Sequence, residues 1–238
     1  FDVDSVNLLN KLNVKRIKIP SSEINNTLLL KHISKLRKKI ILSTGMSNIY
    51  DVEFTLNFLR ANNVKKKDIT ILHCNSEYPT PYKDVNLNVI KTLKNKFKTT
   101  VGYSDHTIGI EIPIAAAACG AEVIEKHFTL NKSFHGPDHK ISCDPSELKK
   151  MIIGIRKVDR SLGSNIKKIT SSEFKNIKTH QKSIVANSKI NKGEKFTEIN
   201  LTTKRPGSGL SSKFYFDLIG KEAKYNYNKN YLIKKIEK

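Results

Sequence analysis

The sequence has few cysteines, and they lack the spacing by which cysteines commonly act together. Cys74, Cys119 and Cys143 form no CxxC pattern and are odd in number, which is typical of a reduced cytosolic protein and not of a disulfide scaffold. No apolar run approaches the length of a membrane span, and Phe1-Asp2-Val3-Asp4 is not a signal peptide. We therefore expect a cytoplasmic protein without a membrane partner.

Acidic residues are also scarce: 22 Asp and Glu stand against 43 Lys and Arg, giving a net charge of +21. Such a charge would suit nucleic acid or an anionic membrane. However, the lysines are dispersed over almost every predicted helix and loop, with no zinc-finger spacing, arginine-rich run or aromatic-interleaved basic stripe. We expect no nucleic-acid partner, although local positive charge would help to attract a phosphorylated or carboxylated substrate.

What the sequence does contain is a regular alternation of short β-type segments and helical patterns. Strands are predicted near residues 14–19, 39–43, 69–73, 99–103 and 122–126, and helices near 5–12, 26–36, 51–61, 87–97, 110–119 and 145–162. The spacing between strands, about 23 to 30 residues, is the period of a βα unit. Five units indicate a doubly wound sheet or part of an eight-fold barrel. Because no GxGxxG follows the first strand and polar residues follow every strand, the barrel is favoured.

The character of the chain changes after Gly163. Residues 164–178 are polar and rich in lysine and serine, which is typical of a linker that can contain a short helix. Short strands and turns follow from Ser183 onward. We therefore expect a partial barrel domain over residues 1–163, a linker over 164–178 and a small β-rich domain over 179–238.

Two histidines mark the ends of neighbouring predicted strands. His106 and His127 each follow a short apolar segment, and an apolar, alanine-rich stretch of helix length separates them. The carboxyl ends of parallel strands are where α/β folds place their chemistry, and two converging neutral imidazoles suit a divalent metal. The alternative is that they are unrelated loop histidines. Strand periodicity places His106 and Asp105 on opposite faces of the sheet, and it separates His127 from Lys126 in the same way.

Hydroxyl groups and a lysine follow the other predicted strands. Lys18 and Ser21 end the first strand, Ser43 the second, Ser76 the third, and Ser104 the fourth. Taken singly, these serines could be helix caps and the lysine a solvated charge. Taken together, they would form a pocket for a phosphate-bearing anion beside a metal, because hydroxyl donors and an ammonium satisfy phosphate oxygens.

Several motifs together resemble the sialic acid synthase family across essentially the whole chain. The barrel motifs are Lys18-Ile19-Pro20-Ser21, 41–46, 73–79, 102–107, 125–129 and 136–139, and segments 182–186 and 204–207 resemble the antifreeze-like (SAF) domain that ends these enzymes. That family condenses phosphoenolpyruvate with an N-acylated hexosamine such as N-acetylmannosamine, releasing phosphate and forming a nonulosonic (sialic) acid.

The resemblance implies roles for the matching residues. His106 and His127 would bind a divalent metal, usually Mn²⁺, and so serve catalysis. The residues that would hold phosphoenolpyruvate are Lys18, Ser21, Ser43, Ser76 and Ser104, of which Ser76 stands where some relatives have Asn. Tyr78 and Asp138 would contact the sugar, and Arg205 would reach it from the partner subunit of a domain-swapped homodimer. Taken alone, Arg205-Pro206-Gly207 predicts an ordinary β-turn.

The implied architecture is the last five βα units of a (β/α)₈ TIM barrel followed by the SAF domain. The family's barrel begins with three further strands, so we expect this chain by itself to be inactive and, with two open sheet edges, prone to aggregate. Legionaminate and pseudaminate synthases are alternatives within the family. The related synthesis of deoxy-octulosonate is disfavoured because its enzymes lack the carboxy-terminal domain. A non-catalytic carbohydrate-binding SAF protein is a further alternative.

Overall fold

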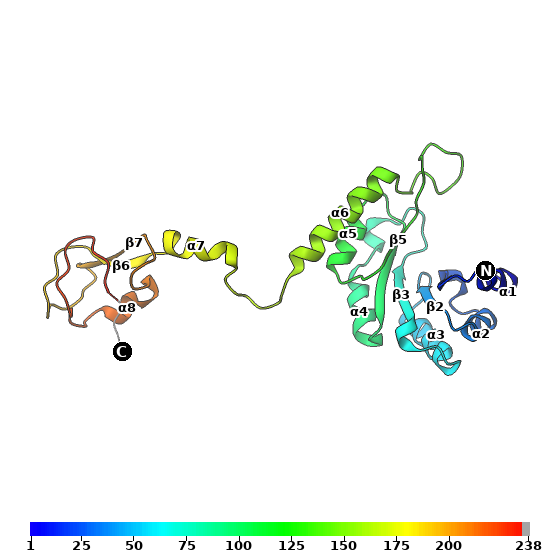
Figure 1. The fold of residues 1–238 in the computed structure, drawn as a ribbon, viewed down its shortest axis with the longest axis horizontal. Helices are drawn as coiled ribbons and strands as arrows, with labels where there is room; N and C mark the ends of the chain where they lie inside the picture. Colours follow the sequence, from blue (N-terminus) through cyan, green and yellow to red (C-terminus); the bar gives the residue numbers. More distant parts are fainter. Residues whose placement is uncertain (235–238) are drawn as a thin grey trace. The chain divides into compact units, whose positions relative to one another are not determined.

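The computed structural model describes residues 1–234 and divides the chain into two compact units between Gly163 and Ser164. The first unit is built on a parallel sheet with the strand order β1-β2-β3-β4-β5 (Figure 1). The strands are β1 (Arg16–Ile19), β2 (Lys39–Ser43), β3 (Ile69–Cys74), β4 (Thr100–Asp105) and β5 (Ile124–Lys126). The five predicted strands are confirmed, and they pair in the order in which they follow one another along the chain.

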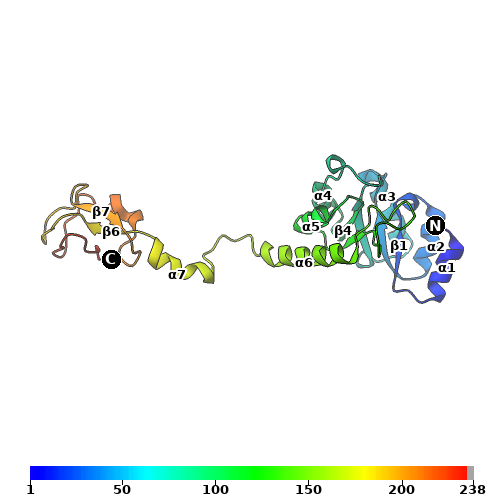
Figure 2. The same cartoon turned by 90° about the horizontal axis from the view of Figure 1, so that it is seen from above.

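Helices alternate with these strands. They are α1 (Val3–Lys11), α2 (Thr27–Lys35), α3 (Ile49–Ala61), α4 (Asn88–Phe97), α5 (Glu111–Ala118) and α6 (Pro145–Leu162), with 3₁₀ turns at Ser21–Glu23, Lys66–Asp68 and Tyr82–Asp84. Figure 2 shows α5 and α6 packed side by side. Capping fixes where two of the helices begin: Asn48 with Asp51 at α3, and Asp144 with Glu147 at α6, form capping boxes. No helix among residues 1–234 is both long and apolar enough to cross a membrane.

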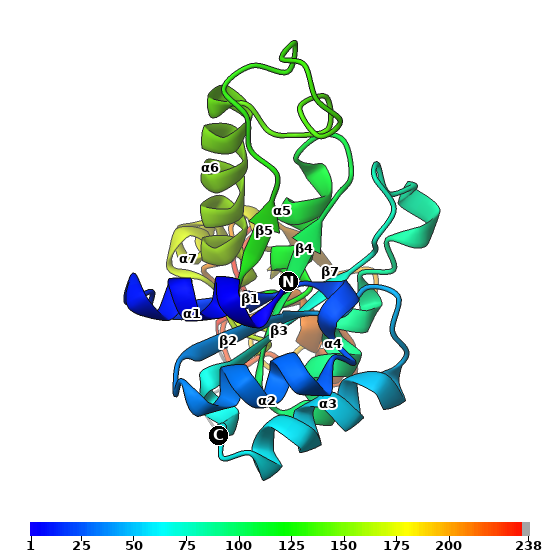
Figure 3. The ribbon, with the colours of Figure 1, turned by 90° about the vertical axis from the view of Figure 1, so that its right-hand side faces the viewer.

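The sheet is strongly curled, and its two outer strands face each other. In a flat sheet of five strands about 4.8 Å apart, the first and last would be separated by roughly 19 Å. Here Nζ of Lys18 on β1 lies 3.2 Å from Oε1 of Glu125 on β5. Figure 3 shows the strands from the side, with α2 and α3 packed next to each other outside β1 and β2. The described residues therefore form a curled parallel half-barrel of five strands, which agrees with the five predicted βα units, while the complete eight-stranded barrel stays a prediction.

The core of the first unit lies between the convex face of the sheet and the helices. Alternate strand residues such as Ile17, Leu42 and Ile71 point into it together with Leu30 of α2 and Ile90 of α4. Because strand side chains alternate between faces, every residue between these apolar positions faces the concave side. The packing of the convex face thus decides which side chains meet on the concave one.

The second unit has a core of its own. Helix α7 (Ser171–His180) is followed by β6 (Ser183–Ala186), which pairs antiparallel with β7 (Leu201–Lys204), and α8 (Tyr215–Leu218) follows a 3₁₀ turn at Ser212–Phe214. Ile184, Ile190 and Leu218 are among the buried residues of its core. The expected small β-rich domain is confirmed. The expected linker contains a longer helix than predicted, because Thr170 and Glu173 form a capping box that starts α7.

Because Ile71 is fully buried in the central strand, we expect Ile71→Ala to lower the free energy of unfolding of the first unit by about 3 kcal/mol through lost burial and a residual cavity. Urea denaturation of the full-length protein measures this value. Ile199→Ala is the matched control, since Ile199 is 83% exposed and should change stability by less than about 0.5 kcal/mol. Equal effects of the two substitutions would contradict the described core.

Candidate functional site

The concave face of the curled sheet carries polar side chains. Ile17 and Ile19 of β1 pack in the core under the helices, so Lys18 between them faces the concave side. The same alternation holds along the other strands. Towards the carboxyl end of each strand it brings to this face a polar or thiol-bearing residue, namely Lys18, Ser43, Cys74, Ser104 and Glu125.

Glu125 connects the two ends of this face. Its Oε1 accepts a hydrogen bond from Oγ of Ser104 (2.7 Å) and lies 3.2 Å from Nζ of Lys18. The side chains of Lys18 and Glu125 are 32% and 37% exposed, so an incoming anion can reach the ammonium group. The sequence analysis gave Glu125 no role, and its only signal there was the strand parity that it shares with His127.

Two of the predicted hydroxyl groups, those of Ser21 and Ser76, converge at Gly45. The N–H of Gly45 donates to Oγ of Ser21 (2.9 Å). A Cβ atom on Gly45 would lie only 2.2 Å from Oγ of Ser76 and 2.9 Å from Oγ of Ser21. Because a side chain here would push both hydroxyls away, the glycine keeps open a small cradle lined by hydroxyl groups.

Ser43 ends β2 with a buried hydroxyl group. The residue is 2% exposed, and its Oγ has no hydrogen-bond partner within residues 1–234. A buried hydroxyl without a partner is unfavourable, and an oxygen of a bound anion would supply one. Nearby, burial raises the pKa of the Cys74 thiol, although the hydroxyls of Ser21 and Ser104 oppose the shift. The thiol therefore stays neutral next to Ser104, its register partner on β4.

His106 and His127 lie next to each other beyond the carboxyl ends of β4 and β5. Their ring centroids are 5.4 Å apart and the rings are nearly perpendicular, at 89°. Nδ1 of His106 is 2.6 Å from the carbonyl oxygen of Asn75, and since a carbonyl only accepts, Nδ1 carries the proton. Burial lowers the pKa of His106, with this hydrogen bond opposing the shift. The ring is therefore neutral, with the lone pair on Nε2.

Tyr78 and Asp138, the two residues predicted to contact the sugar, lie beside the histidines. The ring of Tyr78 stacks on His106 with centroids 3.9 Å apart, and it meets His127 edge-on at 5.4 Å. Oδ2 of Asp138 is 3.6 Å from Nδ1 of His127. Tyr78 is 47% exposed, so its hydroxyl end remains open to a ligand.

The two imidazoles suit a divalent metal. A ligating histidine usually donates its other ring N–H to a carbonyl or carboxylate, and His106 donates in this way to Asn75. Within residues 1–234 there is no group of three or more His, Cys, Asp or Glu side chains that could hold a metal. A metal held by His106 and His127 would therefore keep several positions for oxygen ligands from water or substrate.

Arg205 belongs to the second unit, directly after β7, and is exposed. Its turn is held in place because Oγ of Ser183 donates to the carbonyl of Pro206 (2.7 Å) and the N–H of Gly207 donates to that of Lys178 (2.8 Å). Among the residues that the structure describes, Arg205 forms no ion pair. Its five donors are thus free for a ligand.

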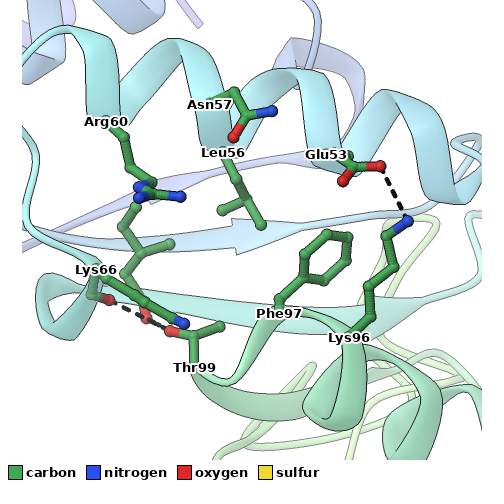
Figure 4. Close-up of a pocket in the computed structure, with 9 residues that line it drawn as sticks. Glu53, Leu56, Asn57, Arg60, Lys66, Lys96, Phe97 and Thr99 are labelled. Carbon is green, nitrogen blue, oxygen red and sulfur yellow. Dashed lines mark hydrogen bonds and ion pairs between the residues drawn. The ribbon is translucent and has the colours of Figure 1, made fainter.

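A partly open pocket of about 180 Å³ lies elsewhere in the first unit (Figure 4). It is lined by residues of α3 and α4, including Leu56, Arg60 and Phe97, and by Thr99 just before β4. It contains none of the predicted site residues, and it lies at the amino-terminal ends of β3 and β4. In a parallel α/β sheet the chemistry belongs to the carboxyl ends, so this pocket is not the candidate site.

Two histidines, the buried His106 and the partly buried His73, predict a pH dependence of stability. Burial lowers the pKa of His73 and of His106 below the ordinary value of about 6.5. Below pH 6.5 the unfolded chain binds protons that the folded protein does not yet bind. We therefore expect the free energy of unfolding to fall as the pH drops from 7 towards the lower folded-state values, by at most about 1.4 kcal/mol per pH unit for each group.

Urea denaturation between pH 7.5 and 5 measures this dependence. His73→Gln, which retains a donor for the carbonyl of Val85, should show a shallower fall than the unmodified protein. His180→Gln is the control, because His180 is exposed at the end of α7. An unchanged slope in His73→Gln would contradict the neutral, partly buried state of His73.

Comparisons with known proteins agree with the division of the chain. A model of the NeuB family matches residues 1–167, and a model of the SAF domain matches residues 181–235. The chain is 53% identical to N,N'-diacetyllegionaminic acid synthase of Campylobacter jejuni, over 98% of the chain and 70% of that protein. It is 37% identical to pseudaminic acid synthase of the same species, over 94% of the chain and 64% of that protein.

Solved structures also include a sialic acid synthetase with a similar fold. A crystal structure of an N-acetylneuraminic acid (sialic acid) synthetase from Leptospira borgpetersenii superposes with a TM-score of 0.69 at 37% identity, covering 74% of this chain and 61% of that one. The chain therefore spans roughly three fifths to seven tenths of the length of these relatives.

Proposed function

This chain belongs to the NeuB family, and from that premise we propose that the protein is a nonulosonic acid synthase. It condenses phosphoenolpyruvate with an N-acylated hexosamine and water, giving a nonulosonic acid and phosphate. One observation carries the proposal: a reachable ammonium, that of Lys18, shares the concave face with several hydroxyl groups, beside two adjacent imidazoles. This arrangement suits a phosphorylated carboxylate next to a metal.

Phosphoenolpyruvate lies on the concave face in this proposal. The ammonium of Lys18 neutralises part of its charge, while the convergent hydroxyls of Ser21 and Ser76 and the unpartnered hydroxyl of Ser43 donate to its oxygens. Ser104 on β4 would join them by turning its hydroxyl from Glu125 to a substrate oxygen. Because Glu125 already accepts from Ser104 and pairs with Lys18, it holds both groups in position before the substrate arrives.

The hexosamine lies beside the histidines. Tyr78 and Asp138 flank them on the open side of the site and offer a hydroxyl and a carboxylate to sugar hydroxyl groups. His106 and His127 would hold the divalent metal, with Mn²⁺ as the proposed ion. When bound, it supplies Lewis acidity towards the aldehyde oxygen of the open-chain sugar. Arg205 would contact the sugar from the SAF domain of a partner subunit in a homodimer.

The reaction forms a carbon–carbon bond and breaks a carbon–oxygen bond. The alkene carbon C3 of phosphoenolpyruvate attacks the aldehyde carbon, whose oxygen takes up a proton and becomes a hydroxyl. Water adds to the cationic C2 and loses a proton. Phosphate then leaves C2 with the electron pair of its C–O bond while the C2 hydroxyl loses its proton, which produces the keto group. Lys18 and the serine hydroxyls stabilise the negative charge on the departing phosphate.

Two sugar classes are candidates. The notable difference in identity between the two Campylobacter jejuni relatives, 53% for the legionaminic and 37% for the pseudaminic acid synthase, favours a diacetamido hexose of the legionaminic type. N-acetylmannosamine, which would give N-acetylneuraminate, is the second candidate, and the 37% identity with the Leptospira borgpetersenii synthetase supports it.

Phosphate release by the full-length protein, meaning this chain together with a complete eight-stranded barrel, tests the proposal. The assay contains phosphoenolpyruvate, Mn²⁺ and one of three sugars: N-acetylmannosamine or the diacetamido hexose that corresponds to legionaminic or to pseudaminic acid. We expect release that depends on the sugar and is fastest with the legionaminic precursor. Release that needs no sugar, or none with any sugar, would contradict a nonulosonic acid synthase.

A further inference from the structure

Two charged residues lie directly before the two histidines and pair with each other on the opposite face of the sheet. Asp105 precedes His106, Lys126 precedes His127, and the two charged residues are register partners in the β4–β5 ladder. Nζ of Lys126 donates to Oδ2 of Asp105. The side chains of Lys126 and Asp105 are only 3% and 0% exposed, so solvent does not screen this ion pair.

The same ammonium also reaches the chain beyond the first histidine. Nζ of Lys126 donates to the carbonyl oxygen of Thr107 (2.6 Å). Oδ1 of Asp105 in turn accepts hydrogen bonds from the N–H (3.2 Å) and the hydroxyl (2.9 Å) of Thr107. Asp105 and Thr107, which flank His106 along the chain, are therefore both bonded to Lys126, the residue before His127.

A buried ion pair is not explained by stability alone. The loss of hydration on burying two charges offsets much of their attraction, and neutral pairs of similar size are often tolerated in their place. What the pair does provide is geometry, because its directional bonds join the ends of two neighbouring strands. Thr107 is fully buried as well, so the connection lies in rigid surroundings.

We propose that Asp105 and Lys126 are positioning residues that set the separation and orientation of His106 and His127, and thereby the affinity of this site for its metal. The inference rests on the proposed function, since it assumes that the two imidazoles bind a divalent cation. Neither residue faces the concave side, so both act through the histidines and not on the substrate. Supporting bonds of this kind commonly change metal affinity by about 10- to 100-fold.

The test is Mn²⁺ binding by the full-length protein, measured by the electron paramagnetic resonance of free Mn²⁺. In the double variant Asp105→Asn/Lys126→Gln, amides replace the charges but retain donors and acceptors. We expect its Kd for Mn²⁺ to be about 10- to 100-fold weaker, with a lower kcat, a KM for phosphoenolpyruvate within about twofold, and a Tm within a few degrees. The control variant Lys94→Gln/Glu122→Gln removes an exposed ion pair and should leave Mn²⁺ binding unchanged.

A second variant keeps the inference testable if the double variant does not fold. Thr107→Val removes only the hydroxyl that donates to Asp105 and should weaken Mn²⁺ binding about 2- to 10-fold. If the folded variants bind Mn²⁺ as the wild type does, the positioning role is overturned while the proposed function stands. If the wild type itself binds no Mn²⁺, the metal site fails and the positioning role fails with it.

Discussion

His106→Ala is expected to lower kcat by about three orders of magnitude, while the KM for the hexosamine changes by no more than a few-fold. The Lewis acid held by His106 and His127 contributes several kcal/mol to the transition state, and little of that contribution is present in the ground state. Steady-state kinetics of the full-length protein at saturating Mn²⁺ measure both constants.

The control for this substitution is His135→Ala, because His135 is exposed in the loop between β5 and α6. Its kcat should equal that of the wild type. A His106→Ala enzyme that keeps a tenth of the wild-type kcat, or that changes only in KM, would show that His106 is not a ligand of a catalytic metal.

Arg205→Ala is expected to raise the KM for the hexosamine by about 10- to 100-fold, which is the usual loss when a charged hydrogen-bond donor is removed from a ligand. The KM for phosphoenolpyruvate and the affinity for Mn²⁺ should stay within twofold, because the residues proposed to bind them all belong to the first unit. Lys204→Ala is the neighbouring control, since Nζ of Lys204 donates to Asn230 within the second unit.

A mixed dimer shows whether Arg205 acts on its own chain or on its partner. One subunit carries Arg205→Ala and the other His106→Ala. If the arginine crosses between subunits, one site receives both substitutions and the other receives neither, so about half of the wild-type activity returns. No recovery in a purified heterodimer would place Arg205 at the site of its own chain.

Strand periodicity made much of the concave face predictable. The alternation that places Ser104 and His106 on one face and Asp105 on the other follows from a period of two residues and requires no tertiary information. The structure shows this alternation, with Ser104 bonded to Glu125 and Asp105 bonded to Lys126 behind the sheet.

The contacts between distant strands could not be predicted in the same way. The pairing of Lys18 with Glu125 depends on how strongly the sheet curls, and the sequence pattern of each strand contains nothing about that curl. The bond from His106 to the carbonyl of Asn75 likewise depends on the path of the loop after β3. For this reason Glu125 and Asn75 received no role from the sequence.

Local backbone geometry explains the smaller differences. The first strand was expected from residue 14 but begins at Arg16, because Asn13 adopts a left-handed conformation (φ 54°) after α1 and the chain turns there before it extends. The short helix α8, with only four residues, was missed because so few residues show no helical period.

The most direct test of the proposed chemistry follows one oxygen atom. Phosphoenolpyruvate labelled with ¹⁸O at the oxygen that bridges C2 and phosphorus is incubated with the full-length protein, Mn²⁺ and the preferred hexosamine, and the released phosphate is analysed by mass spectrometry. Cleavage of the C–O bond predicts that the label appears in phosphate, in amounts equal to the nonulosonic acid formed. Label retained in the sugar acid, or phosphate released without hexosamine, would contradict condensation at the concave face as proposed.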